Sequence, residues 1–328
     1  MTMQNELVTR RTLSPAASQW VKREGTLLIA LIVLCLVLTF IAPNFGTLGN
    51  ALNILRQAAF VGIIATGMSL VIIAGEIDIS VGSNVALTSA LLGVLVAHDG
   101  IPVFAAIPIV LVVGALVGIG AGAIRAYLNV PSFIVTLAFY LALRGLALFI
   151  TDAFPNAITS DAFNYLGAGY LFGIPVPALF MVFFFALFFF ISRKTAFGRS
   201  VYAVGGNAEA SRLSGIRVPR IRVMIFAMTG ILASIVGVLL SAQLSSGNPG
   251  IGNGLEFDVI AAVIIGGASL SGGRGSLIGT LFGVLFITVL SNGLVLIGVN
   301  PYVQNIARGA IVLVAVLLSS VRTRRGAA

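Results

Sequence analysis

The sequence SRKTAFGRSVYAVGGNAEASRLSGIRVPRIR, which runs from Ser192 to Arg222, is the only long polar interruption between the hydrophobic segments of this chain. It carries seven of the nineteen Lys and Arg residues. Burying seven such charges in a bilayer would cost roughly 3 kcal/mol each. We therefore predict that this stretch lies in water on the cytoplasmic side of a membrane, and that the hydrophobic segments around it span that membrane.

The composition of the chain is that of a membrane protein. Of its 328 residues, 59% are hydrophobic and 9% are charged, which does not describe a water-soluble surface. Ten hydrophobic runs lie near the ~20 residues that a helix needs to cross ~30 Å of hydrocarbon. They are Thr26–Ala42, Gln57–Gly75, Val81–Ala97, Pro102–Ile124, Pro131–Thr151, Pro175–Ser192, Val223–Gln243, Glu256–Leu270, Ser276–Val299 and Val303–Val321. The sequence predicts an all-α polytopic membrane protein with about ten transmembrane helices.

The distribution of basic residues predicts the orientation. With a cytoplasmic N-terminus, no connecting loop on the outer face holds any Lys or Arg, as the positive-inside rule requires. We predict a cytoplasmic segment over residues 1–25, a transmembrane domain over 26–321 with a cytoplasmic loop at 193–222, and a cytoplasmic tail over 322–328. The net charge of +9 then reflects this topology and attraction to anionic lipid headgroups. Nucleic acid is not an expected partner.

Several kinds of chemistry are absent from the sequence. Neither Lys22 nor Lys194 follows the Gly-rich loop of a nucleotide-hydrolysing site, so the chain is not expected to hydrolyse ATP. His98 and Cys35 are the single histidine and the single cysteine, which excludes a disulfide and a multi-His or cysteine metal site. We expect no catalytic residues, no metal and no cofactor.

The acidic residues weaken the case for an ion-coupled transporter. Such proteins generally keep ionisable groups near the bilayer centre. The acids here lie close to predicted span ends; they are Glu76, Asp78, Glu256 and Asp258.

Two hydrophobic segments resemble each other. The run VIIAG at Val71–Gly75 recurs as VIIGG at Val263–Gly267, and a Gly- and Ser-rich turn follows each copy. Six predicted spans separate the copies, so both have the same orientation. The pattern predicts a parallel internal repeat of spans two to four onto spans eight to ten. The span at Glu256–Leu270 is short, and is either little tilted or partly buried in protein.

Glycines recur at four-residue spacing, which places them on one face of a helix. This spacing favours close helix packing in membranes over contact with a substrate. The positions are Gly114, Gly118 and Gly122 in span four, and Gly275, Gly279 and Gly283 leading into span nine.

The polar loop contains a short predicted helix. Asn207 can cap its start by accepting backbone N–H bonds, and Gly215 can end it with a positive φ. Such a helix could lie across the membrane face and dock onto another protein. The alternative is a solvated basic loop bound to anionic lipid.

Four segments of the chain resemble the permease subunits of bacterial ATP-binding-cassette (ABC) importers of the ribose, xylose, arabinose and galactose type. They are GEIDISVG at Gly75–Gly82, PSFIVTL at Pro131–Leu137 continuing to Arg144, GGNAEASRLSG at Gly205–Gly215 and GGASLSGG at Gly266–Gly273. Two positions depart from the family pattern. Glu76 stands where the family usually has a second Gly, and Ser211 replaces the second Ala of an E-A-A pattern.

The resemblance implies an assembly in the bacterial inner membrane. Two permease subunits, identical or different, pair around a central pathway, cytoplasmic ABC ATPase subunits dock on the loops, and a periplasmic sugar-binding protein delivers a monosaccharide. The residues implied for ATPase coupling are Gly205, Gly206, Asn207, Glu209, Ala210, Ser211, Arg212 and Gly215.

For the pathway we single out polar residues that flank the start of span three or lie on span five. They are Asp78, Ser80, Ser83, Asn84, Thr136 and Arg144. Asp78 either lines the pathway or caps span three, where a carboxylate is stabilised by the helix dipole. Arg144, inside a span, must meet a carboxylate, backbone carbonyls or water, and a structural partner is favoured over substrate contact. Two other functions stay open: a stand-alone ion-coupled secondary transporter, and the same permease architecture with a non-sugar cargo.

Overall fold

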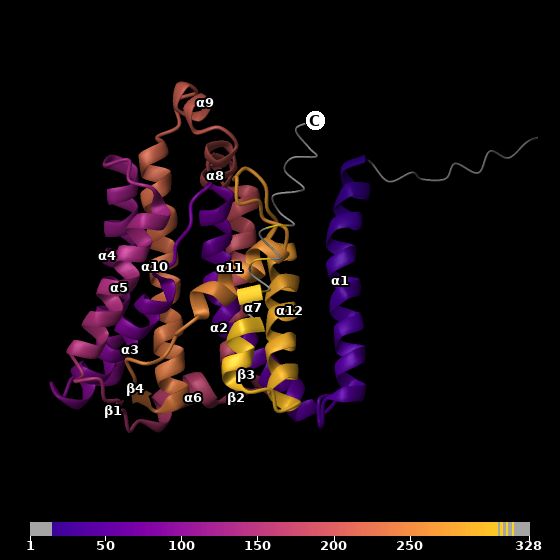
Figure 1. Cartoon of the computed structure of the whole chain (residues 1–328). Helices are drawn as coiled ribbons and strands as arrows, with labels where there is room; N and C mark the ends of the chain where they lie inside the picture. The colour runs from indigo at the N-terminus through magenta and orange to yellow at the C-terminus, as the bar shows by residue number, and fades with distance from the viewer. Residues whose placement is uncertain (1–14, 308, 311–312, 314–316, 318–328) are drawn as a thin grey trace, which may run out of the picture.

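The computed structural model describes residues 15–307, 309–310, 313 and 317 (Figure 1). The helices labelled in Figure 1 are α1 (Pro15–Ile41), α2 (Leu48–Ile73), α3 (Val81–Ala97), α4 (Val103–Tyr127), α5 (Ser132–Phe149), α6 (Asp161–Ala168), α7 (Val176–Lys194), α8 (Ala196–Gly206), α9 (Ala208–Leu213), α10 (Val218–Leu244), α11 (Leu255–Ile265) and α12 (Leu277–Leu296). Most of the predicted N-terminal segment, most of the last hydrophobic run and the whole predicted tail lie outside the described residues.

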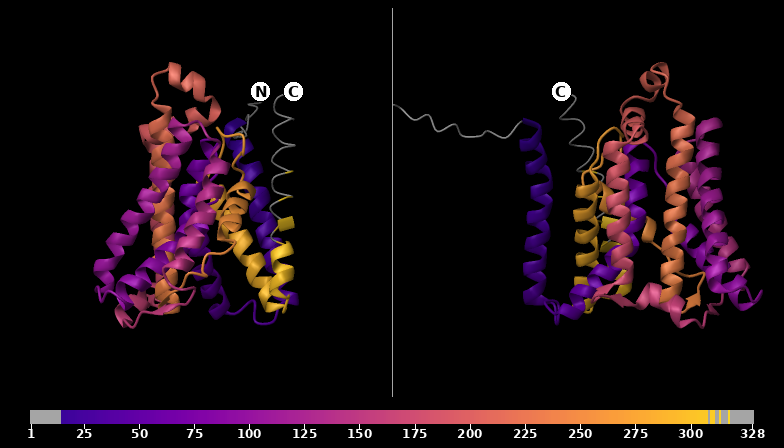
Figure 2. Two further views of the ribbon diagram at one scale, coloured as in Figure 1. Left: turned by 60° about the vertical axis from the view of Figure 1, so that its left-hand side comes forward. Right: turned by 180° about the vertical axis from the view of Figure 1, so that it is seen from behind.

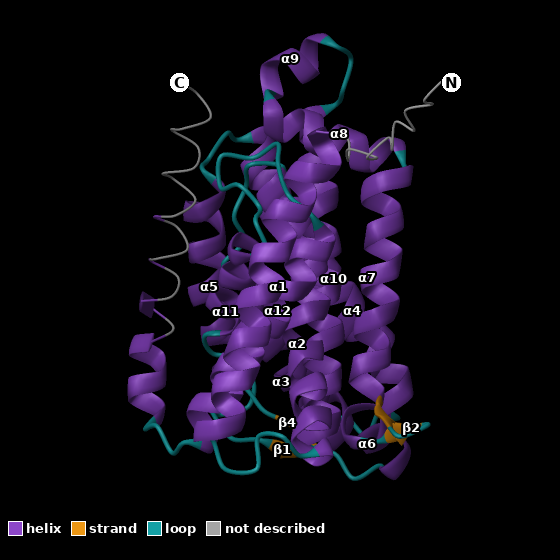
Figure 3. Cartoon of the chain, turned by 90° about the vertical axis from the view of Figure 1, so that its right-hand side faces the viewer, coloured by secondary structure: helices purple, strands orange, loops and turns teal. Residues whose placement is uncertain are grey.

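The long helices run side by side between two distinct ends of the molecule (Figures 1 and 3). One end carries α8 and α9, and we call it the α8–α9 end. The other, the hairpin end, carries two short antiparallel ladders. Their strands are β1 (Asn156–Ala157) with β4 (Ser246–Gly247), and β2 (Tyr170–Leu171) with β3 (Ile174–Pro175). This architecture confirms the prediction of an all-α polytopic membrane protein.

Six helices of the described chain are long and apolar enough to cross a membrane: α2, α4, α5, α7, α10 and α12. Two further apolar helical stretches, Gly25–Ile41 in α1 and Val81–Ala97 in α3, are shorter. α11 is shorter still, with 11 residues. Its residues from Val259 to Ile264 are all buried, so the expectation that this segment is partly buried in protein is confirmed.

Several predicted boundaries were wrong, each for a local reason. α2 begins at Leu48 rather than Gln57, because the Thr47 hydroxyl accepts the backbone N–H of Asn50 and caps an additional stretch of helix. α11 ends at Ile265 rather than Leu270. α10 begins at Val218, inside the predicted polar loop, so that its first turns carry Arg220 and Arg222.

α2 forms the centre of the bundle. Every residue of α2 from Ala58 to its end is buried, because α7, α10, α11 and α12 all pack around it. A helix that is apolar on all sides is expected in such a position. α1 lies at the edge (Figure 1), where Leu31 and Leu38 join an apolar cluster with Val289 of α12.

Two segments of irregular backbone enter the bundle from opposite ends (Figures 1 and 2). The α2–α3 segment, residues 74–80, enters from the α8–α9 end. The α10–α11 segment, residues 245–254, enters from the hairpin end. Gly82 of α3 packs against Gly252 and Glu256, so the starts of α3 and α11 meet inside the protein. Irregular backbone at membrane depth is tolerated only where protein or a polar cavity surrounds it.

The two copies of the repeated sequence end their helices in the same way. Gly75 and Gly267 both have positive φ, of 79° and 94°. In each copy the following residue donates a backbone hydrogen bond five residues back: Glu76 to Val71, at 3.0 Å, and Ala268 to Val263, at 3.1 Å. Glycine is favoured at such a position because a side chain would be strained there. The sequence similarity therefore corresponds to a shared helix ending.

Candidate coupling loop and translocation core

The loop between α7 and α10 folds into two helices at the tip of the molecule (Figure 1). Asn207 ends α8 and caps α9, since its side-chain oxygen accepts the backbone N–H of Ala210 at 2.9 Å. Gly215 follows α9 with φ of 83°. The short helix, its cap and its glycine stop are all confirmed as predicted from the sequence.

The outer face of α9 is exposed and carries both charge and apolar surface. Arg212 donates two hydrogen bonds to the Glu209 carboxylate, and both side chains remain largely in solvent. These hydrogen bonds hold the pKa of Glu209 below its usual range, so the carboxylate stays ionised. Leu213, at the end of α9, is 76% exposed. Ser211 points inward and is buried. This face is available to a partner.

The C-terminal end of α8 rests directly on the membrane bundle. A Cβ on Gly205 would overlap the Ile73 carbonyl at the end of α2, and would lie 2.6 Å from the Gly273 nitrogen. Gly273 also donates its backbone N–H to the Ile73 carbonyl, at 2.8 Å. Tyr202 of α8 donates its hydroxyl to the Gly275 carbonyl, at 3.1 Å. The loop is thus seated on the end of α2 and on the Gly-rich turn before α12.

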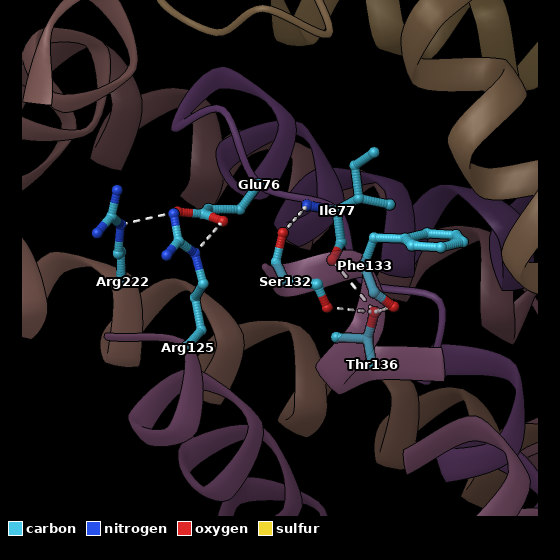
Figure 4. Close-up of polar contacts among 7 residues, drawn as sticks. All are labelled: Glu76, Ile77, Arg125, Ser132, Phe133, Thr136 and Arg222. Carbon is cyan, nitrogen blue, oxygen red and sulfur yellow. Dashed lines mark hydrogen bonds and ion pairs between the residues drawn. The ribbon is translucent and has the colours of Figure 1, made fainter. Parts of the chain in front are cut away.

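Glu76 joins three parts of the chain at the same end of the bundle (Figure 4). Arg125 of α4 donates a hydrogen bond from Nε to Oε2 at 2.7 Å, and the Nε of Arg222, in α10, lies 2.7 Å from Oε1 as an ion pair. Glu76 is 2% exposed. Sequence reasoning missed this cluster. A usable signal was present, because Glu76 stands where the family usually has a glycine, and Arg125 and Arg222 lie at the ends of two predicted spans.

α5 holds the next residue of the α2–α3 segment through its backbone (Figure 4). The Ser132 hydroxyl oxygen accepts the N–H of Ile77 at 3.1 Å, and the Thr136 hydroxyl lies 3.3 Å from the Ile77 carbonyl. Thr136 is completely buried. Thr136, one of the pathway residues proposed from the sequence, therefore supports the α2–α3 segment.

Asp78 forms a local turn. Its Oδ1 accepts the backbone N–H of Ser80 at 2.9 Å and the Ser80 hydroxyl at 2.6 Å. Ser80 is the residue that precedes α3, and no side chain caps the first turn of that helix by a hydrogen bond. Asp78 is buried, so its carboxylate orders the entry into α3 from inside the bundle.

Arg144 meets backbone carbonyls of the α10–α11 segment. Its Nη1 donates to the carbonyls of Pro249, at 3.0 Å, and Ile251, at 2.8 Å. Glu256, at the start of α11, is completely buried; its Oε1 accepts the N–H of Gly254 at 3.2 Å. The sequence placed this acid at a span end, which is correct, but that end lies inside the protein. Glu256 therefore does not support the argument against ion coupling that rested on acids at span ends.

Buried polar atoms without a hydrogen-bond partner occur at several places in the described part of the chain, Arg56 Nε and Thr288 Oγ1 among them, and four lie around the starts of α3 and α11 and on α5. They are Ser83 Oγ, Asn84 Oδ1, Arg144 Nη2 and Glu256 Oε2. Buried polar groups are normally paired, so unpaired ones need an explanation. A core with free donors and acceptors can interact with a polar cargo. Glu256 is the member that sequence reasoning left out.

The glycines with four-residue spacing lie at helix contacts. A Cβ on Gly114, Gly118 or Gly122 of α4 would meet α10 within 3.0 Å, at atoms of Ser234, Phe226 and Val223 respectively. Gly279 and Gly283 of α12 pack against the α11 end at Gly266 and Ala262, and Gly275 packs against the Ile73 side chain. Close backbone approach of this kind substitutes for the hydrophobic drive that lipid does not supply.

Among the residues that the structure describes, no group of three or more His, Cys, Asp or Glu side chains could hold a metal ion. The geometry is that of a helical membrane bundle with an exposed helical loop seated on its core.

Comparison with known proteins identifies the family. Residues 50–316 match the family described as "Branched-chain amino acid transport system / permease component". The chain belongs to this permease family. The matched part includes α8, α9, both irregular segments and α5, so every feature of the coupling loop and core lies within the permease region.

Three relatives extend over most of this permease. It is 52% identical over 316 residues to the probable ABC transporter permease protein YphD of Escherichia coli strain K12, with 95% of each chain covered. It is 44% identical to the ribose import permease protein RbsC of Haemophilus influenzae, covering 88% of this chain and 90% of that one. The xylose transport system permease protein XylH of Haemophilus influenzae is 35% identical, with 89% and 95% covered. No solved structure matches.

Proposed function

We propose that this chain is the membrane-spanning permease subunit of an ABC importer for a monosaccharide. The observation that carries the proposal is the seating of α8 on the bundle at Gly205, which leaves α9 exposed above it. Relatives named as ribose and xylose permeases support a sugar as cargo. The chain itself then transforms nothing, and a partner subunit hydrolyses the ATP.

The proposed topology has about ten spans in the bacterial inner membrane, with both termini and the α8–α9 end in the cytoplasm. Loops at the hairpin end contain no Lys or Arg in the described part of the chain, which supports this orientation. The shared helix ending at Gly75 and Gly267 supports the parallel repeat.

ATPase subunits would dock on α9 and its flanks. Because Gly205 contacts the end of α2 directly, a displacement of α8 and α9 would reach the α2–α3 segment without an intervening flexible linker. A second permease subunit would complete the pathway in the plane of the membrane. A periplasmic sugar-binding protein would deliver the cargo at the hairpin end.

The proposed pathway lies where α3 and α11 begin. Sugar hydroxyls both donate and accept hydrogen bonds, and the unpaired atoms of Ser83, Asn84, Arg144 and Glu256 offer both functions. In such an importer the binding protein supplies the tight site, so weak polar contacts suffice here. Asp78, Ser80 and Thr136 would shape this region through the turn at the start of α3.

The second candidate is a stand-alone ion-coupled transporter, and the buried carboxylate of Glu256 favours it. The same architecture with a non-sugar cargo would differ only in what the binding protein delivers.

Reconstitution into liposomes separates these functions. We expect no uptake of radiolabelled ribose or xylose by the chain alone, with or without a proton or sodium gradient. We expect ATP-dependent uptake once the ATPase, a binding protein loaded with that sugar and any second permease subunit are added. Concentrative uptake by the chain alone on an ion gradient would refute the proposal. Uptake of amino acids by the complete complex would refute the sugar assignment and leave the subunit assignment standing.

A further inference from the structure

α5 is bonded to both of the irregular segments. Ser132, in its first turn, binds Ile77 of the α2–α3 segment, and Arg144 binds Pro249 and Ile251 of the α10–α11 segment. Ser132 and Arg144 are twelve residues apart on one straight helix, about 18 Å along its axis. One helix therefore contacts a segment that enters from the α8–α9 end and another that enters from the hairpin end.

The α2–α3 segment is also bonded to the helix that follows the coupling loop. Glu76 pairs with Arg222 in the second turn of α10, and α10 begins three residues after Gly215. A movement of α9 would therefore act on Glu76 through α10, and on the adjacent Ile77 that Ser132 binds.

α5 packs along one face on α3 and on the main core, where Val135 is buried, and leaves its other face exposed within the described subunit. Large apolar side chains over much of its surface are exposed, including Ile134 at 55%, Leu141 at 65% and Phe149 at 81%. Leu143 and Ala147 belong to a small apolar cluster with α3. The apolar contacts place α5 on α3, and the polar bonds at Ser132 and Arg144 attach it to the two irregular segments.

The α10–α11 segment is held at its start by the pairing of β4 with β1 and by the bond from the Ile158 N–H to the Ser245 carbonyl, and few bonds hold the rest of it. The N–H of Asn248 binds the Ser89 hydroxyl oxygen at 2.9 Å, and Arg144 supplies the two bonds to Pro249 and Ile251. Asn253 is exposed, and Glu256 follows at the buried start of α11. A displacement of Arg144 would therefore move the backbone that leads into α11.

We propose that Ser132 and Arg144 are positioning residues for transport, and that α5 is the rigid link between the two irregular segments. A displacement that starts at α9 moves the α2–α3 segment, α5 follows through Ser132, and Arg144 moves the α10–α11 segment at the hairpin end. The pathway opens at that end in step with the coupling loop. This inference rests on the proposed function.

The test uses Asn253→Cys as a reporter in a chain whose Cys35 is replaced by Ala, reconstituted with the ATPase and the loaded binding protein. A membrane-impermeant maleimide, added from the hairpin side, measures the exposure of residue 253. We expect its labelling rate to differ about tenfold between the nucleotide-free state and the state trapped with ATP and vanadate. Ser132→Ala, which leaves the 3.3 Å contact from the Thr136 hydroxyl to the Ile77 carbonyl, should reduce the difference, and Ser132→Ala combined with Thr136→Val should bring it below about twofold.

A matched control is Thr151→Val. Thr151 is buried just beyond α5, but its hydroxyl donates only within its own turn, to Ala147. This variant should keep the full nucleotide response. An unchanged response in the variant that combines Ser132→Ala with Thr136→Val overturns the proposed link.

Arg144 provides the second arm. Arg144→Lys retains hydrogen-bond donors and should keep part of the response, whereas Arg144→Met should lose it while ATP hydrolysis continues. A full response in Arg144→Met also overturns the link. If Arg144→Met fails to assemble, the substitutions at Ser132 and Thr136 test the link through α5. Should the unmodified complex show no ATP-driven uptake, the proposed function itself fails, which is a separate result from loss of the link.

Discussion

The two irregular segments have the same role in the fold, but different kinds of bonds fix them in place. Each brings the chain into the bundle so that a short helix can begin there. The α2–α3 segment is held through a buried side chain, Glu76, which is paired with arginines of two other helices. The α10–α11 segment is held through its own backbone carbonyls by Arg144, and carries no charged side chain of its own.

This difference indicates which of the two segments a movement of the coupling loop can displace directly. Ion pairs at Glu76 connect the α2–α3 segment to α4 and to α10, and α8 rests on the helix that precedes it. The α10–α11 segment is bonded to β1, α3 and α5, and its Gly252 packs against Gly82 at the start of α3. We therefore expect the first segment to respond directly to the coupling loop and the second to respond through α5.

Removing the charge of Glu76 should have the largest effect, because it breaks the bonds that distinguish the α2–α3 segment. Glu76→Gln leaves the guanidinium groups of Arg125 and Arg222 without a counter-charge, and their side chains are 19% and 15% exposed. Losing one partner of a buried ion pair costs about 3–5 kcal/mol. Thermal unfolding in detergent measures the loss. Glu209→Gln, at an exposed pair on α9, is the control and should leave the unfolding temperature unchanged. An equally stable Glu76→Gln protein would contradict this account of the segment.

A methyl group at Gly205 tests whether the coupling loop acts on the same segment. In Gly205→Ala the new Cβ would overlap the backbone of Ile73, which cannot yield as a flexible side chain can. We expect the free energy of unfolding to fall by about 1–3 kcal/mol. We also expect ATP-driven uptake by the complete complex to fall. Gly49→Ala, in the first turn of α2, is the control, since nothing lies within 4 Å of a Cβ there. If both variants transport equally well, the close contact between α8 and the end of α2 is not required for transport.

Gly82→Ala probes the point where the two segments meet. A Cβ at Gly82 would overlap the Glu256 carboxylate and lie 2.6 Å from the Gly252 carbonyl. We expect the free energy of unfolding to fall by about 1–3 kcal/mol. The effect should lie at the lower end of this range, because the Glu256 side chain can shift. Gly145→Ala in α5, with no neighbour within 4 Å, is the control. The comparison is measured by thermal unfolding, and equal stability of the two variants would show that α3 and α11 are not in close contact.

The smallest expected effect is at Tyr202, which bonds α8 to the turn before α12. Tyr202→Phe removes the hydrogen bond to Gly275 and should cost about 1 kcal/mol. Burial raises the pKa of Tyr202, so its contribution is present below the ordinary pKa of about 10 and is lost as pH rises through the folded-state value. The wild type should therefore lose more stability above pH 10 than Tyr202→Phe does. Parallel pH profiles would contradict the burial of the Tyr202 hydroxyl, and an equally stable Tyr202→Phe protein would contradict the bond.

Sequence reasoning recovered what depends on local pattern. Long apolar runs gave the helices of the bundle, and α3 coincides with the predicted span Val81–Ala97. Asn207 and Gly215 marked the start and the stop of α9, because caps depend on neighbouring residues alone. Family motifs led to Ser80, Ser83, Asn84, Thr136 and Arg144.

What sequence reasoning could not supply is the depth at which helices begin. α11 starts inside the bundle, so the span-end position of Glu256 gave no measure of its burial. The Glu76 cluster depends on three segments far apart in the chain, and no local pattern brings Arg125 and Arg222 together. Arg144 binds backbone carbonyls, and any residue can supply a carbonyl, so the sequence does not indicate which residues Arg144 contacts.

The central claim is that α9 faces the cytoplasm and receives the force that opens the pathway. Two single-cysteine proteins test it in a Cys35→Ala background: Leu213→Cys on α9 and Phe172→Cys at the hairpin end, where the native side chains are 76% and 94% exposed. In intact spheroplasts, a membrane-impermeant maleimide should label position 172 and not position 213. In inside-out vesicles the pattern should reverse. Labelling of position 213 from outside intact spheroplasts would contradict the account.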